Sequence, residues 1–140
     1  MNRWSDPQTA RKILTSYTRF AVVGCSSQPY RASNSVSRYL IANGYEVVPV
    51  NPAEDEVLGL KCYPDLVSIP EPIEVVDIFR RSELVGPHVD EAIEIGAKAI
   101  WMQLDVIDVA AAERAAAAGL DVVMDRCPAI DHPAMVASKS

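Results

Sequence analysis

Three neighbouring stretches of the sequence decide the fold: RFAVVGCSSQP (residues 19–29), SNSVSRYLIAN (33–43) and YEVVPVNP (45–52). They give an apolar run, a turn, a helical stretch and a second apolar run, which is the order of the first half of a nucleotide-binding fold. The turn departs from the dinucleotide fingerprint, because Gly24 is followed by Cys-Ser-Ser where further glycines normally stand. This departure favours a ligand other than NAD.

Short apolar runs continue along the chain and predict further strands. The runs are 20–23, 47–50, 75–79, 99–102 and 120–124. Runs of this kind are typical of strands buried on both faces, and strands that alternate with helices pair in parallel. We therefore predict an α/β fold: a Rossmann-like, doubly wound, mainly parallel sheet of five to six strands with helices on both faces.

Helical segments separate these strands, and three of them end in a glycine: Gly44, Gly96 and Gly119. Glycine at such a position can adopt the left-handed conformation that ends a helix. A leading helix is expected over about 7–18, and a short strand is expected near 60–63. We predict one domain over the full 140 residues.

The charge and the cysteines exclude several classes of function. A formal net charge of −6 without a basic cluster argues against nucleic-acid binding, although a small anion needs only a local group of donors. No run approaches the ~18 apolar residues of a membrane span, and the N-terminus has no apolar leader. The three cysteines, Cys25, Cys62 and Cys127, have no framework spacing. We therefore expect reduced thiols and a cytoplasmic protein.

The carboxyl ends of the first three strands should meet at one crevice, where a doubly wound sheet binds its ligand. The start of the 33–43 helix offers backbone N–H groups and the positive end of the helix dipole to a phosphate, and Arg31 can add a bidentate contact. The hydroxyls nearby are those of Ser26, Ser27, Ser33 and Ser35. The alternative is that Ser33 or Asn34 only caps the helix.

The second and third strands contribute different side chains to this crevice. Asn51, flanked by prolines, stands where an NAD site usually has an acidic residue for the ribose, which disfavours a nicotinamide ligand. Phe79-Arg80-Arg81 follows the third long strand, and its two guanidinium groups suit phosphate. The alternative for the arginines is a surface ion pair with a carboxylate such as Glu83.

The motifs also occur in a specific order along the chain. They are GCSSQP, RYLIANGYEVVPVNP, GLKCYPDL, IPEPIEVVDIFRRSE, AIWMQL and VVMDRC. With this ordered set, over about residues 10–130, the chain resembles the small stand-alone CoA-binding proteins, which are similar to the CoA-binding domain of the succinyl-CoA synthetase alpha subunit. The resemblance implies that coenzyme A or an acyl-CoA binds at the carboxyl edge of the sheet.

The resemblance also implies roles for the crevice residues. The turn after the first strand would hold phosphates, residues 50–52 would line the adenosine side, and residues 79–81 would border the nucleotide or the pantetheine arm. The implied cofactor-binding residues are Gly24, Cys25, Ser26, Ser27, Arg31, Ser33, Asn34, Ser35, Val50, Asn51, Pro52, Phe79, Arg80 and Arg81. Gln103 and Asp105 are left out, because the family pattern has glycine at position 105 and a carboxylate there can repel a phosphate.

Catalysis is not predicted. His88 and His132 stand without a nucleophile or ligand cluster, and we expect both at the surface. The histidine-bearing domain of the ligases that the chain resembles is not expected here, so the predicted function is non-catalytic binding of CoA or acyl-CoA. Two alternatives stay open: a thiol-redox module in which Cys25 forms a mixed disulfide with CoA, and a regulatory domain responsive to a nicotinamide nucleotide. No protein partner is predicted.

Overall fold

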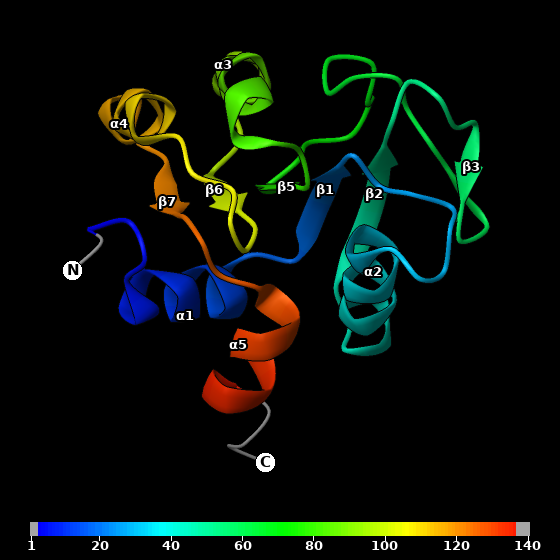
Figure 1. Cartoon of the computed structure of the whole chain (residues 1–140), viewed down its shortest axis with the longest axis horizontal. Coiled ribbons are helices and arrows are strands. Elements are labelled where there is room, and N and C mark those ends of the chain that lie inside the picture. Colours follow the sequence, from blue (N-terminus) through cyan, green and yellow to red (C-terminus); the bar gives the residue numbers. More distant parts are fainter. Residues whose placement is uncertain (1–2, 137–140) are drawn as a thin grey trace.

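Five parallel strands form the central sheet, in the order β2-β1-β5-β6-β7 (Figure 1). The computed structural model describes residues 3–136. The strands are β1 (Arg19–Val23), β2 (Glu46–Val50), β5 (Val75–Ile78), β6 (Ala99–Met102) and β7 (Asp121–Val123). The predicted Rossmann-like, mainly parallel sheet is confirmed.

Helices cover both faces of the sheet, as predicted (Figure 1). On one face lie α1 (Pro7–Ser16), α2 (Ala32–Ala42) and α5 (Pro128–Met135). On the other face lie α3 (Val85–Glu94), which follows the short 3-10 helix η1 (Ser82–Leu84), and α4 (Val109–Ala117). Gly44, Gly96 and Gly119 all have positive φ just after a helix, so the expected helix ends are present.

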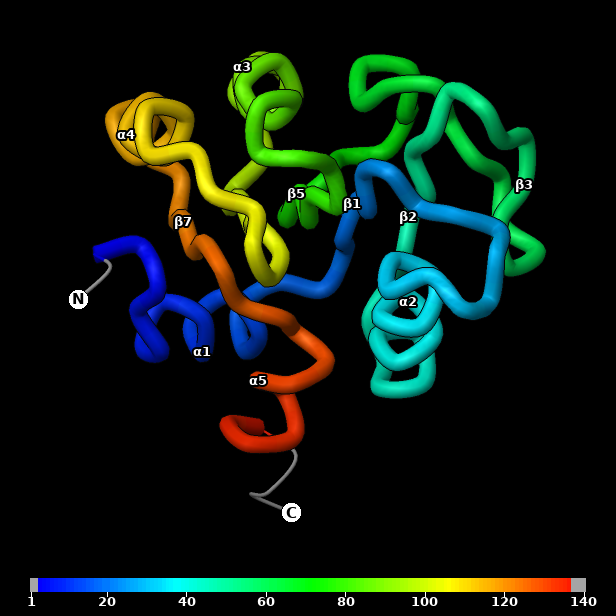
Figure 2. The backbone as a smooth tube through the Cα atoms, viewed as in Figure 1, coloured from blue at the N-terminus to red at the C-terminus, as the bar shows by residue number. Residues whose placement is uncertain are grey.

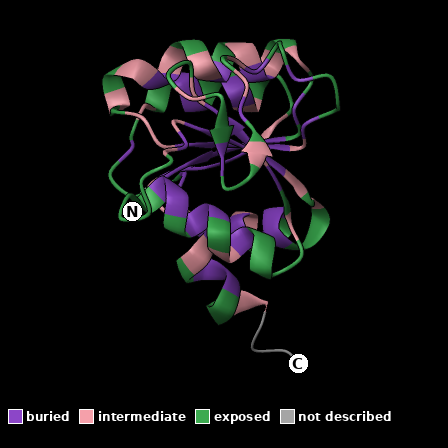
Figure 3. Cartoon of the chain, turned by 90° about the vertical axis from the view of Figure 1, so that its right-hand side faces the viewer, coloured by how far each residue is buried: buried purple, intermediate pink, exposed green. Residues whose placement is uncertain are grey.

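Two apolar cores hold these layers together, because the buried strands present alternate side chains to opposite faces. Phe20, Val22 and Trp101 pack towards α1, α2 and α5, whereas Val23 and Ile78 belong to the core under α3 and α4. Figure 3 shows the strands as a buried layer between helices whose outer surfaces are exposed. The strands are therefore buried up to their carboxyl ends.

The winding direction of the chain reverses between β1 and β5. From β1 the chain proceeds through α2 to β2 at one edge of the sheet, and β5, β6 and β7 then follow on the other side of β1 (Figure 2). Ligands of open α/β sheets bind at the carboxyl ends of the strands beside such a reversal. The connection after β2 forms a separate hairpin, β3 (Glu56–Val57) and β4 (Leu60–Lys61), where a short strand was expected.

The C-terminal region corrects one prediction. His132 is buried, with 6% of its surface exposed, and lies in α5 rather than in a polar tail. Its Nδ1 is 2.7 Å from the Tyr39 hydroxyl, and its ring makes edge contacts with Tyr39 and Tyr45. The prolines at positions 128 and 133 hid this helix from the sequence, although Pro128 at its first position is favourable. Among residues 3–136, no helix is long and apolar enough to cross a membrane.

Candidate functional site

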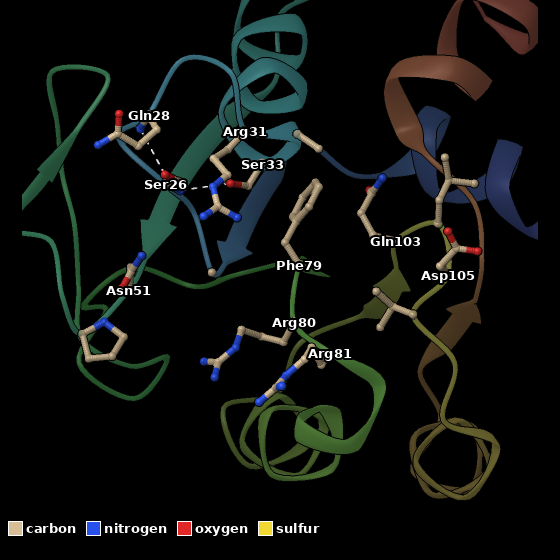
Figure 4. A pocket seen from close by; sticks show the side chains of 15 residues that line it. Ser26, Gln28, Arg31, Ser33, Asn51, Phe79, Arg80, Arg81, Gln103 and Asp105 are labelled. Atoms are coloured by element: carbon tan, nitrogen blue, oxygen red, sulfur yellow. Dashed lines mark hydrogen bonds between the residues drawn. The ribbon is translucent and has the colours of Figure 1, made fainter.

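A cavity of about 780 Å³ opens at the carboxyl edge of the sheet (Figure 4). One side, here called the α2 wall, consists of Gly24, Ser26, Gln28, Arg31, Ala32, Ser33, Asn51 and Pro52. The opposite side, the β6 wall, consists of Gln103, Leu104, Asp105 and Val106. Between them lies the β5 segment, Phe79–Arg81. This order follows from the sheet, in which β5 lies between β1 and β6.

Gly24 brings β1 and β5 into close contact at the bottom of the pocket. It has φ +81°, and a Cβ atom at this position would lie 2.4 Å from the carbonyl oxygen of Phe79. The Gly24 N–H donates to the Val50 carbonyl at 2.8 Å, so the same residue also ties the turn to β2. Only glycine fits both the backbone conformation and the space.

The turn between β1 and α2 is held in shape by its own polar groups. Ser33 Oγ accepts from the Ser26 N–H at 3.0 Å, and Ser26 Oγ accepts from the Gln28 N–H at 3.0 Å. The side-chain amide of Asn34 donates to the Ser26 carbonyl at 2.9 Å and accepts from Arg38 Nε at 2.9 Å. The turn is therefore preformed, without the second and third glycines of a dinucleotide loop.

The start of α2 lies at the pocket and has no side-chain cap. Arg31 is its N-cap residue, its side chain makes no capping hydrogen bond, and the first turn has no acidic residue. Ala32 and Ser33, the first two helical residues, line the pocket. The positive end of the helix dipole thus faces the cavity without a neutralising side chain.

The arginines add positive charge to a protein that is acidic as a whole. Among residues 3–136, no ion pair involves Arg31 or Arg80. Arg81 has a 3.7 Å contact with Glu83, and both side chains are largely exposed, so this pair is weak. The surface-pair alternative accordingly applies to Arg81 alone, and Arg31 and Arg80 are available to a polyanion.

Asn51 fixes the end of β2 rather than presenting its amide to a ligand. Its Nδ2 donates to the Cys25 carbonyl at 3.0 Å, and its Oδ1 accepts from the Ala53 N–H at 2.9 Å. Asn51 and Pro52 therefore form a rigid part of the α2 wall. Neither offers the carboxylate that holds the ribose in NAD sites.

Five of the predicted residues do not line the pocket: Cys25, Ser27, Asn34, Ser35 and Val50. Asn34 supports the turn from behind, and Val50 is buried in the core. The Ser27 hydroxyl donates to Glu54 Oε2 at 2.7 Å, and the Ser35 hydroxyl donates to the Ala32 carbonyl at 3.1 Å. Each of these residues helps to shape the site without facing it.

The β6 wall contains Gln103 and Asp105, which the sequence analysis left out. Asp105 has φ +65° in the position where the family pattern has glycine, and aspartate tolerates this conformation better than most residues. Its N–H donates to Asp125 Oδ1 at 2.7 Å, and its carbonyl accepts from the Ser82 hydroxyl at 3.3 Å. These two hydrogen bonds tie Asp105 to the neighbouring loops, so the backbone of the wall is supported on both sides.

The cysteines are buried, and Cys25 faces the core instead of the pocket. Its Sγ is 3.5 Å from the Ser37 hydroxyl, and burial raises the pKa of the thiol despite this contact. Burial likewise raises the pKa of Cys62 to about 11. Since thiol exchange requires an accessible thiolate, this geometry does not favour the redox alternative.

Asp77 and His88 are titratable groups whose burial the sequence analysis does not predict. Asp77, in the middle of β5, is fully buried, and neither of its carboxylate oxygens has a hydrogen-bond partner among residues 3–136. Burial raises its pKa well above the ordinary value, because a carboxylate without water or a hydrogen-bond donor disfavours the charged form. His88 is half-buried in the first turn of α3, and burial together with the charge of Arg80 lowers its pKa. No metal-binding group of His, Cys, Asp and Glu occurs in the described part of the chain.

Comparison with known proteins identifies the family. A family model described as a CoA binding domain matches residues 18–133. The chain belongs to this CoA-binding domain family. The predicted resemblance is therefore confirmed, and the pocket lies within the matched region.

The relatives include both stand-alone proteins and ligases. The uncharacterized protein YneT of Bacillus subtilis is 38% identical over 122 residues, which cover 87% of this chain and 90% of that protein. ADP-forming acetate–CoA ligase I of Archaeoglobus fulgidus is 35% identical over 71 residues, which cover 51% of this chain but only 10% of the ligase. The structure of a hypothetical protein from Pyrococcus horikoshii superposes with a TM-score of 0.90 at 43% identity, covering 94% of this chain and 92% of that chain.

Proposed function

We propose that this protein binds coenzyme A or an acyl-CoA at the carboxyl edge of its sheet and catalyses no reaction on it. The observation that carries the proposal is the uncapped start of α2, which meets the unpaired Arg31 and Arg80 around one cavity. A phosphate group placed there gains backbone N–H donors, the helix dipole and guanidinium groups together. The cavity volume of about 780 Å³ also lies within the range of cofactor sites, roughly 300–1,000 Å³.

The non-catalytic part of the proposal rests on the composition of the pocket. No histidine, cysteine or lysine is among the described residues that line it. Its serine hydroxyls, on Ser26 and Ser33, each accept from a backbone N–H of the turn. Neither hydroxyl has a hydrogen bond to a carboxylate in the described part of the chain, whereas covalent catalysis usually pairs the nucleophile with a general base. The buried free thiols favour a reducing compartment, and we assign this function to the cytoplasm.

Thermal unfolding in the presence of four nucleotides tests the proposal. A ligand that binds only the folded state stabilises it by about 2.7 kcal/mol at a concentration of 100 times its Kd. We expect CoA to raise the Tm most, dephospho-CoA to raise it less, and ATP and NADH to raise it least. No increase at millimolar CoA contradicts the proposal, and a larger increase with NADH than with CoA favours a nicotinamide-responsive domain instead.

A further inference from the structure

The β6 wall contains a buried hydrogen-bond acceptor that the protein leaves unused. Gln103 lines the pocket with only 5% of its surface exposed. No donor among residues 3–136 reaches its Oε1 atom. Figure 4 shows Gln103 on the far side of Phe79 from Ser26 and Asn51. An unpaired buried acceptor of this kind typically costs about 1–3 kcal/mol.

The position of this side chain is set by the sheet and not by a mobile loop. Gln103 directly follows β6, and its N–H donates to the Ile78 carbonyl at 3.4 Å. Its own carbonyl accepts from the Val106 N–H at 2.9 Å, which closes a turn. Both backbone groups are thus used, and the main chain from which the side-chain amide projects is held by the sheet and the turn.

The two walls of the pocket are suited to different chemical groups. The α2 wall presents donors, namely helix N–H groups and the guanidinium of Arg31, and these suit phosphate oxygens. A phosphate has no donor for Gln103 Oε1 when it is fully ionised, so this atom suits an N–H, O–H or S–H group instead. Leu104 and Val106 beside it provide apolar contact for methylene groups.

Coenzyme A has the same division along its length. Its nucleotide end is polyanionic, and its pantetheine arm consists of methylene and methyl groups with amide N–H donors, one hydroxyl and a terminal thiol. We propose that Gln103 accepts a hydrogen bond from a donor of the pantetheine arm and thereby selects the complete cofactor over its nucleotide half. This inference rests on the proposed CoA-binding function.

Binding calorimetry on Gln103→Met tests the inference, because methionine has a similar length and no acceptor of comparable strength. The ligands are CoA, S-methyl-CoA and 3′-phospho-ADP, which lacks the arm. We expect the variant to bind CoA about tenfold more weakly and 3′-phospho-ADP within twofold of the wild-type protein. The unliganded variant should unfold at the same or a higher Tm, since it no longer buries an unpaired acceptor.

Gln28→Met is the matched control, because Gln28 is an exposed glutamine on the α2 wall. It should leave the ratio of the CoA and 3′-phospho-ADP affinities unchanged. An equal loss with CoA and S-methyl-CoA in Gln103→Met identifies an amide N–H or the hydroxyl of the arm as the donor, whereas a loss with CoA alone identifies the thiol.

Three results overturn the inference. An unchanged CoA affinity in Gln103→Met removes the proposed hydrogen bond, while CoA binding by the wild-type protein still supports the proposed function. An equal loss for CoA and 3′-phospho-ADP, with a lower Tm, indicates a structural role. No binding of CoA to the wild-type protein removes the proposed function and the inference together.

Discussion

The α2 wall and the β6 wall differ in how their polar side chains are used. On the α2 wall, Ser26, Ser33 and Asn51 are hydrogen-bonded within the turn or to its neighbours. Arg31, the one charged residue of this wall, has no ion pair among residues 3–136, and its guanidinium lies 5.9 Å from the centroid of the Tyr30 ring. On the β6 wall, Gln103 has an unused acceptor. The first wall is therefore a preformed backbone surface, whereas the second contains a buried side-chain acceptor that has no donor among residues 3–136. A polar residue at a strand end can serve either purpose, and the hydrogen-bond partners decide which.

Gly24→Ala tests the preformed α2 wall most severely. The new Cβ meets the Phe79 carbonyl oxygen at 2.4 Å in a backbone conformation with φ +81°, so β1 and β5 must move apart. We expect the free energy of unfolding, measured in urea, to fall by about 3 kcal/mol or more. CoA binding should be lost with it.

Gly44→Ala is the control for this substitution. Gly44 has φ +91°, but no atom lies within 4 Å of a Cβ added there, so backbone strain is the only expected effect. A loss of about 1 kcal/mol is expected. Equal losses in the two variants would show that the contact with Phe79 contributes nothing.

Asp77→Asn tests a buried carboxyl group inside β5, next to the segment that lines the pocket. Burial raises the pKa of Asp77 in the folded state above its unfolded value of about 4, so the folded protein binds the proton more tightly. Its contribution to stability is complete below pH ~4 and is lost as the pH rises towards the folded pKa, by up to about 1.4 kcal/mol per pH unit. The asparagine variant lacks this loss.

Urea unfolding of both proteins across a pH series measures this contribution. Asp77→Asn should gain stability relative to the wild-type protein as the pH rises above ~4. The difference between the two proteins isolates Asp77 from carboxylates such as Glu74, whose pKa is lowered by backbone hydrogen bonds and which act in the opposite direction. A pH-independent difference would show that Asp77 does not titrate in a buried environment.

Arg80→Gln tests the β5 segment between the two walls. Arg80 is half-buried at the pocket and has no ion-pair partner among residues 3–136, so its charge is available to a phosphate. We expect calorimetry to show a loss of at least tenfold in CoA affinity. Arg81→Gln should cost less, because Arg81 is mostly exposed and contacts Glu83. Equal losses for CoA and dephospho-CoA would exclude the 3′-phosphate as the group that Arg80 binds.

Cys25 is predicted to line the pocket, but in the structure its thiol lies in the core. Because burial raises its pKa, we expect CoA disulfide to leave Cys25 unmodified in the folded protein near neutral pH, as measured by mass spectrometry. The same treatment in urea, which exposes the thiol, is the control. Rapid formation of the mixed disulfide at Cys25 in the folded protein would restore the redox hypothesis.

The sequence predicts the fold better than it predicts which side chains face the pocket. Apolar runs and helix-ending glycines predict the parallel sheet, and the strand order then locates the pocket at the carboxyl ends. Which polar groups face that pocket depends on local hydrogen bonds, such as that of Ser27 to Glu54, and these leave no periodic pattern. The same limit applies to His132, which is buried by contacts with Tyr39 and Tyr45, residues far away in sequence.

Two residues that the predicted site does not include carry a signal in the sequence. Asp77 is the one charged residue within the apolar run 75–79, and a lone carboxylate in a doubly covered strand must be buried. Gln103 directly follows the next apolar run, at the edge where strand ends meet. It was set aside because of the neighbouring Asp105. In the structure Asp105 has positive φ, a conformation that glycine adopts readily, and Gln103 lines the pocket.

Ser27→Ala and Ser33→Ala give the finest test of how the α2 wall works. Ser27 lies outside the pocket lining, and its backbone N–H still reaches Glu54 at 3.1 Å when the hydroxyl is removed. We expect CoA affinity, measured by calorimetry, to stay within twofold. Ser33→Ala removes the acceptor for the Ser26 N–H and should weaken CoA binding several-fold through the shape of the turn. If the two substitutions have equal effects, the internal hydrogen bonds of the turn do not set its affinity, and the difference between the two walls lies in charge alone.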